Sequence, residues 1–190
     1  MSSIRNTVIR SMHDVGLAAW FGGALMGAVG VNGATRSVAG PQDDLAVAAS
    51  GWARWSPVAA AAVGVHVIGG VGLILANRGR VAGQSGVGAN TVVKTVLTGA
   101  AVASTVYSGV LGAHLAAAAE TDVPVEAATV PSPQTPPKVA STQQQLRVLQ
   151  WVTPALTGVL IVLGAQQGEQ QKPAEIAKGV ATKTWRRARS

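Results

Sequence analysis

Residues His13 to Ala34 read HDVGLAAWFGGALMGAVGVNGA, and no charged side chain occurs from Val15 to Thr35. A helix rises about 1.5 Å per residue and needs about 20 apolar residues to cross the hydrocarbon core of a bilayer. The stretch therefore predicts a first transmembrane helix over about 13–34. We expect this helix to be retained, because the apolar run is longer than the core of about 7–15 residues in a signal peptide.

Three further apolar runs follow, at about 56–77, 92–118 and 148–166. The whole chain of 190 residues is 48% hydrophobic and only 12% charged. Soluble domains typically carry about 25% charged residues, whereas a helix bundle in lipid needs few charges. We predict an all-α fold, an integral membrane bundle of four transmembrane helices over residues 1–168, with the lipid bilayer as its surroundings.

The connections between the runs have distinct compositions. Residues 36–55 predict a short surface helix that begins near Pro41, with Trp52 and Trp55 at the membrane surface, where indole rings are favoured. The Gly- and Ser-rich residues 81–90 predict a flexible loop, and the Pro-rich residues 120–145 predict an extended, mobile outer loop.

The C-terminal residues 169–190 form a basic tail. Two interpretations stay open: a disordered tail, or an amphipathic helix on an anionic leaflet with Trp185, Arg186 and Arg187 at the membrane surface. The net charge of +7 does not indicate nucleic-acid binding, since most of the excess lies in this one tail.

The distribution of Lys and Arg predicts the orientation. The first and third connections hold only Arg36, Arg54, Lys138 and Arg147. The N-terminus, the second connection with the start of the third run, and the tail hold Arg5, Arg10, Arg78, Arg80, Lys94, Lys172, Lys178, Lys183, Arg186, Arg187 and Arg189. Because positive charge prefers the cytoplasmic side, we expect a multi-pass protein of the cell membrane with both termini in the cytoplasm.

Small residues recur at helical spacing within the runs. Helices associate in lipid through close packing, and glycine lets two backbones approach. The glycines expected in packing grooves are Gly23, Gly27, Gly30, Gly64 and Gly112. Such grooves predict association of the four helices, and contact with other membrane proteins or with a second copy of the chain.

Three histidines and a tyrosine are the candidate polar residues inside the membrane. By position in its run, His13 is expected at the inner edge, His66 near the middle and His114 near the outer edge. Ligands of one metal ion lie within about 2 Å of it, so this spread in depth argues against a shared metal site. The leading interpretation is that each histidine forms a hydrogen bond with a neighbouring helix. A proton path through His66, Tyr107 and His114 is the alternative, although no Asp or Glu lies within a run.

The first run also carries a motif. His13 is followed seven residues later by Trp20-Phe21-Gly22-Gly23. This resembles the opening helix of small four-helix membrane proteins of the copper-resistance-D type. The resemblance implies a helical bundle, sometimes linked to copper handling or haem. The chain has no Cys, so thiolate ligands are excluded.

No pattern of catalytic residues is present: we expect neither an enzyme nor a bound cofactor. The leading hypothesis is an accessory or interaction subunit of a membrane complex. The alternatives are a transporter or proton-conducting protein that uses intramembrane histidine, and a membrane protein linked to haem b or copper.

Overall fold

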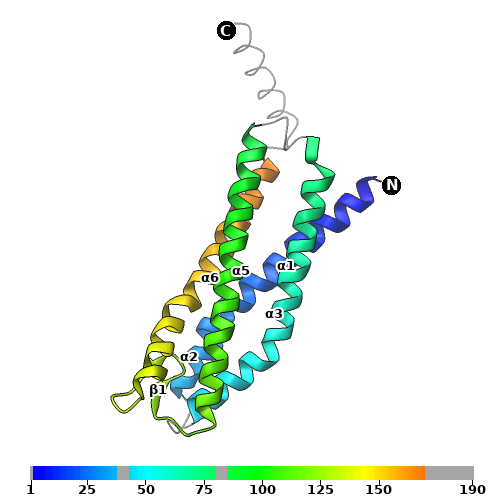
Figure 1. Cartoon of the computed structure of the whole chain (residues 1–190). Helices are drawn as coiled ribbons and strands as arrows, with labels where there is room; N and C mark the ends of the chain where they lie inside the picture. Colours follow the sequence, from blue (N-terminus) through cyan, green and yellow to red (C-terminus); the bar gives the residue numbers. More distant parts are fainter. Residues whose placement is uncertain (1, 38–42, 80–84, 170–190) are drawn as a thin grey trace, which may run out of the picture.

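Four long helices make up most of the described part of the chain. The computed structural model describes residues 2–37, 43–79 and 85–169, and its long helices are α1 (Ser2–Met26), α3 (Asp43–Ala76), α5 (Ser85–Ala119) and α6 (Pro137–Glu169). They lie side by side in an elongated bundle (Figure 1). Each is long and apolar enough to cross a membrane. The predicted all-α bundle of four helices is therefore confirmed. Its four candidate spans indicate a multi-pass membrane protein.

The bundle consists of two tight helix pairs. Helix α1 packs chiefly on α3, and α5 chiefly on α6, while the contacts between α1 and α6 and between α3 and α5 close the ring. Its buried centre consists of Leu17, Trp20, Ala62, Ala101 and Leu160. Large apolar side chains cover the outside, among them Val15, Leu75 and Val96. This distribution is the one expected when lipid surrounds the helices.

Polar side chains also join the helices. The indole nitrogen of Trp20 donates to the hydroxyl of Thr105 at 3.1 Å, which links α1 to α5. The hydroxyls of Ser104 and Thr153 lie 2.9 Å apart between α5 and α6. Both bonds satisfy groups that would otherwise face hydrocarbon. The first joins the α1/α3 pair to the α5/α6 pair, and the second lies within the α5/α6 pair.

The predicted surface helix near Pro41 is wrong as a separate element. The described part of that segment is instead the beginning of α3, which runs from Asp43 through Pro57 without interruption. A Cβ atom on Gly23 would overlap the ring of Trp55, and one on Gly27 would overlap the ring of Trp52. The ring of Trp55 therefore packs on Gly23 of α1, and the ring of Trp52 packs on Gly27 just after α1. Neither ring lies free along a membrane surface.

The stretch after α1 is irregular. A π-helical segment (Gly27–Val31) leads into α2 (Asn32–Ala34) and a final 3₁₀ turn (Thr35–Ser37). The buried hydroxyl of Thr35 donates to the carbonyl of Asn32 at 2.8 Å and accepts from the amide of Ala128 at 3.1 Å. This end of the first span is thereby attached to the loop that precedes α6.

That loop is not the extended, mobile segment expected from its prolines. It contains a short antiparallel pair, β1 (Val125–Ala127) and β2 (Val130–Pro131), and α6 begins within it at Pro137. The fully buried Gln143 donates to the carbonyls of Ala127 at 2.9 Å and Ala128 at 3.2 Å. We call residues 121–136 with the first turns of α6 the cap. Proline suits the first turn of a helix, where no backbone N–H is needed.

The second predicted loop is also shorter than expected, because α5 begins at Ser85 rather than near residue 91. The hydroxyl of Thr91 donates to the carbonyl of Val87, within this early part of the helix. Trp185, Arg186 and Arg187 belong to residues 170–190, which lie outside the described part of the chain.

Candidate functional site

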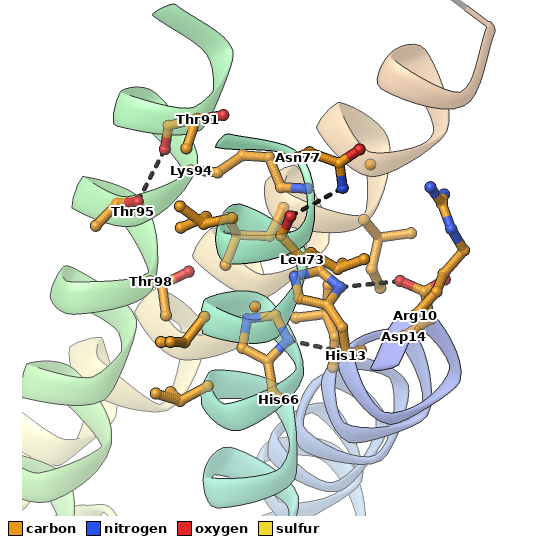
Figure 2. Close-up of a pocket in the computed structure, with 18 of the residues that line it drawn as sticks. Arg10, His13, Asp14, His66, Leu73, Asn77, Thr91, Lys94, Thr95 and Thr98 are labelled. Atoms are coloured by element: carbon orange, nitrogen blue, oxygen red, sulfur yellow. Dashed lines mark hydrogen bonds and ion pairs between the residues drawn. The ribbon is translucent and has the colours of Figure 1, made fainter. Parts of the chain in front are cut away.

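A mostly apolar cavity with several polar side chains opens between the four helices, at the end where α1 and α5 begin and α3 ends (Figure 2). Its volume is about 490 Å³. The polar residues that line it are Arg10, His13, Asp14, His66, Asn77, Thr91, Lys94, Thr95 and Thr98. The apolar residues include Leu17, Val67, Leu73, Ile74, Leu160 and Ile161. A mostly apolar pocket with a few convergent polar groups is the usual form of a small-molecule site.

His13 and His66 meet in this cavity. Their ring centroids are 4.2 Å apart with an angle of 40° between the ring planes, and both side chains are buried. The expectation that they lie at different depths is therefore wrong. Because α1 extends back to Ser2 and α3 ends at Ala76, the two histidines lie at similar distances from the same end of the bundle.

Two glycines allow this close approach of α1 and α3. A Cβ atom on Gly69 would lie 2.5 Å from the backbone nitrogen of His13, and one on Gly16 would lie 2.6 Å from the backbone nitrogen of His66. Real Cβ atoms essentially never come so near to another heavy atom. The backbones of the two helices are thus in direct contact at the level of the imidazoles.

The hydrogen bonds fix the tautomer of both rings. Nδ1 of His66 lies 2.9 Å from the backbone carbonyl of His13, and Nδ1 of His13 lies 2.9 Å from a carboxylate oxygen of Asp14. A carbonyl and a carboxylate only accept, so each Nδ1 carries the proton. In the neutral form of each ring Nε2 therefore carries the lone pair, and no hydrogen bond to either Nε2 is found among the described residues. In Figure 2 these nitrogens face the side on which α5 carries Lys94 and Thr98.

The charged groups of the cavity are mainly cationic. Arg10 comes from α1 and the partly buried Lys94 from α5, and Asp14 is the one acidic side chain in the described lining. The carboxylate of Asp14 is itself engaged by His13. With neutral imidazoles the lining holds two cations and one anion, so it favours a negatively charged guest.

The sequence interpretation missed Lys94 as a site residue. Its signal was present, because Lys94 stands three residues after Thr91 and four before Thr98, on one face of a helix. The sequence predicts only that Lys94 lies at the charged start of the third span. A lysine with a threonine face toward the bundle interior is instead a candidate binding residue.

Tyr107 and His114 are not part of this cavity. The hydroxyl of Tyr107 donates to the side-chain carbonyl of Gln145, and the tyrosine ring is half exposed. His114 is exposed on α5. The structure therefore does not bring these two residues to His66, and the expected path through all three is not assembled within the described chain.

The other glycines expected in packing grooves differ from Gly23 and Gly27. A Cβ on Gly30 would meet the side chain of Met26 in the preceding turn, and one on Gly64 or Gly112 would meet no atom within 4 Å. Gly64 and Gly112 therefore do not lie at close contacts between helices of the described chain. Glycine content alone does not say which face of a helix meets its neighbour.

Comparison of the chain with protein-family models, with curated proteins and with solved structures gives no match. Function must therefore be inferred from the residues of the site.

Proposed function

We propose that this protein is an integral membrane binding protein whose cavity takes a small organic acid with an apolar body. The observation that carries this proposal is the convergence of Arg10, Lys94 and two buried imidazoles on an otherwise apolar cavity of about 490 Å³. Arg10 is exposed at the edge of the cavity, whereas Lys94 is partly buried. A partly buried cation attracts an anion more strongly than a fully solvated one, because the local dielectric constant is lower. The apolar walls suit the body of such a molecule.

The histidines add a proton-dependent contact. A neutral imidazole with its proton on Nδ1 accepts a hydrogen bond at Nε2, whereas a protonated imidazole donates there. An acid that arrives with its proton can donate to Nε2, and an anion can accept from Nε2 once a ring is protonated. Either form makes use of the two Nε2 atoms, and the same chemistry suits a binding protein and a carrier that couples uptake to protons.

The test compares an acid with its neutral analogue. Benzoate and benzamide are titrated calorimetrically into the protein in lipid nanodiscs. We expect benzoate to bind and benzamide not to. Lys94→Gln is expected to weaken benzoate about tenfold, since a hydrogen bond to a charged group contributes about 1.5–3 kcal/mol. Lys138→Gln, at an exposed lysine of α6 outside the cavity, is the matched control. Equal affinities of the two variants would contradict the proposal.

We propose further that the protein lies in the cell membrane with both termini in the cytoplasm, so that this cavity faces the cytoplasm. The Lys and Arg residues of the full sequence support this orientation, because eleven belong to the N-terminus, the second connection with the start of the third run and the tail, against four in the first and third connections. The role as an interaction subunit stays a proposal of its own. A second protein recovered in fixed proportion after gentle extraction would support it.

Haem is a second candidate guest, favoured by the lone pairs of the two Nε2 atoms. Rings only 4.2 Å apart leave no space for a macrocycle between them, so His13 and His66 do not suit the two axial positions of one haem. One of the two imidazoles would hold the haem iron through its Nε2, and Arg10 and Lys94 would pair with the carboxylates of the guest. Bound haem would supply redox chemistry.

Copper fits less well than haem, since the described residues hold no group of three His, Cys, Asp or Glu side chains. A titration with haemin tests the haem candidate. A Soret band that shifts on binding, and is lost in His66→Ala, would support it.

A further inference from the structure

A second cavity lies at the opposite end of the bundle, beside the cap. Its volume is about 670 Å³. The residues that line it are Ala28, Asn32, Gly33, Arg36, Thr129, Arg147, Val148, Gln150, Trp151, Val152 and Ala155. They come from the irregular end of the first span, from the cap and from α6. None of them lines the cavity with the two histidines, so this second cavity stands independently of the proposed function.

Its back wall is held by a chain of hydrogen bonds. The side-chain nitrogen of Asn32 donates to the side-chain carbonyl of Gln150 at 3.0 Å, and the indole of Trp52 donates to the side-chain oxygen of Asn32 at 2.9 Å. Asn32 follows directly on the π-helical segment Gly27–Val31. Single π-helical turns occur frequently at functional sites. The side-chain amides of Asn32 and Gln150 therefore already have hydrogen-bond partners, and these bonds hold this wall of the cavity in place.

The mouth of this cavity is positively charged. Arg36 and Arg147 are both exposed, and neither forms an ion pair with an acidic residue among the described ones. They stand on two segments that are distant in sequence, the end of the first span and α6. Two guanidinium groups at one opening favour an anion with several oxygens, which they bind through paired hydrogen bonds.

An apolar strip runs from the arginines toward the middle of the bundle. Arg147, Trp151 and Ala155 follow one another at intervals of four on one face of α6. Val148 is 65% exposed and Trp151 is 50% exposed. A tryptophan one turn below an arginine is the arrangement found at the interface of a membrane, where the ring lies below the level of the headgroups.

We propose that this cavity binds an anionic phospholipid, with the phosphate between Arg36 and Arg147 and one acyl chain along Val148 and Trp151. Basic pockets between transmembrane helices bind anionic headgroups on the cytoplasmic side of membranes, and we infer the same chemistry for the opposite leaflet at this end of the bundle. A free phosphate would use the arginines but not the exposed apolar strip. The strip continues from the charged mouth into the lipid-facing surface, which is the course that an acyl chain follows from its own headgroup.

Native mass spectrometry of the detergent-extracted protein tests the proposal. The full chain is incubated with dioleoyl phosphatidylglycerol or with dioleoyl phosphatidylcholine, and retained lipid is counted. We expect retention of phosphatidylglycerol over phosphatidylcholine. The double variant Arg36→Gln/Arg147→Gln is expected to lower this retention about tenfold or more, since each basic residue contributes about 1 kcal/mol toward anionic lipid. Arg54→Gln, an exposed arginine outside the cavity, should leave it unchanged.

A second measurement locates the acyl chain. Phosphatidylglycerol with brominated chains should quench Trp151, and the quenched part of the fluorescence should disappear in Trp151→Phe while lipid retention persists. Equal retention of the two lipids, unchanged retention in the double variant, or displacement of phosphatidylglycerol by inorganic phosphate at the same concentration would each overturn the proposal.

Discussion

Single atoms decide the geometry of the histidine site. His13 and His66 meet because Gly16 and Gly69 carry no Cβ, and each glycine faces backbone atoms of the opposite helix. Backbone cannot rotate away as a side chain can, so any Cβ there must push α1 and α3 apart. Such a shift would also lengthen the bond from His66 to the backbone carbonyl of His13.

Gly16→Ala is therefore expected to destabilise the protein by about 1–3 kcal/mol, the usual cost of overpacking. Alanine favours a helix over glycine by about 1 kcal/mol, so the steric cost must exceed this gain. Gly64→Ala is the matched control, because its Cβ would meet nothing within 4 Å. Thermal unfolding in detergent measures both variants. The close contact would be disproved if Gly16→Ala were as stable as Gly64→Ala.

At the scale of the elements, the sequence predicted the number of helices but not their ends. Charge-free runs mark the part of each helix that lies in hydrocarbon, and four such runs were evident. The helices continue beyond those runs into polar segments, such as Asp43–Trp55 in α3 and Pro137–Arg147 in α6. Depths measured from the ends of the runs were therefore wrong, and this error separated His13 from His66.

The cap was equally hidden from the sequence. Prolines predict an irregular backbone, but they do not say whether its carbonyl groups find partners. The side-chain amide of Gln143 donates hydrogen bonds to the carbonyl groups of Ala127 and Ala128. Gln143 lies in a part of α6 that the sequence predicts to be loop. Val125 of the cap is also buried, with Leu45 of α3 and Leu115 of α5. One amide and a small apolar cluster convert a proline-rich connection into an ordered element.

Gln143→Ala is expected to loosen the cap. Its loss leaves the carbonyls of Ala127 and Ala128 buried without this donor, at a cost of about 1–3 kcal/mol. Hydrogen exchange across residues 121–136 should then become faster, while exchange in the middle of α5 stays unchanged. Gln144→Ala, at the exposed neighbouring position, is the control. Unchanged exchange in the cap of Gln143→Ala would show that other contacts hold it.

For the whole molecule, the two cavities lie at opposite ends of one bundle, and their chemistry differs. The first combines cations with imidazoles inside the ring of helices, and the second places two arginines at the outer surface of α6 and the first span. The orientation in the membrane decides which of them meets the cytoplasm. In the orientation proposed above from the positive-inside rule, the histidine cavity would face the cytoplasm.

The absence of Cys makes this orientation directly measurable, since any introduced cysteine is the only thiol in the chain. Glu126→Cys lies on the exposed surface of the cap, and Gly79→Cys lies exposed near the end of α3, at the opposite end of the bundle. A membrane-impermeant maleimide added to intact cells should label Glu126→Cys alone. Gly79→Cys should react only after the membrane is permeabilised. The reverse pattern would place the histidine cavity on the outside, so that the organic acid proposed as its guest would come from the surroundings of the cell.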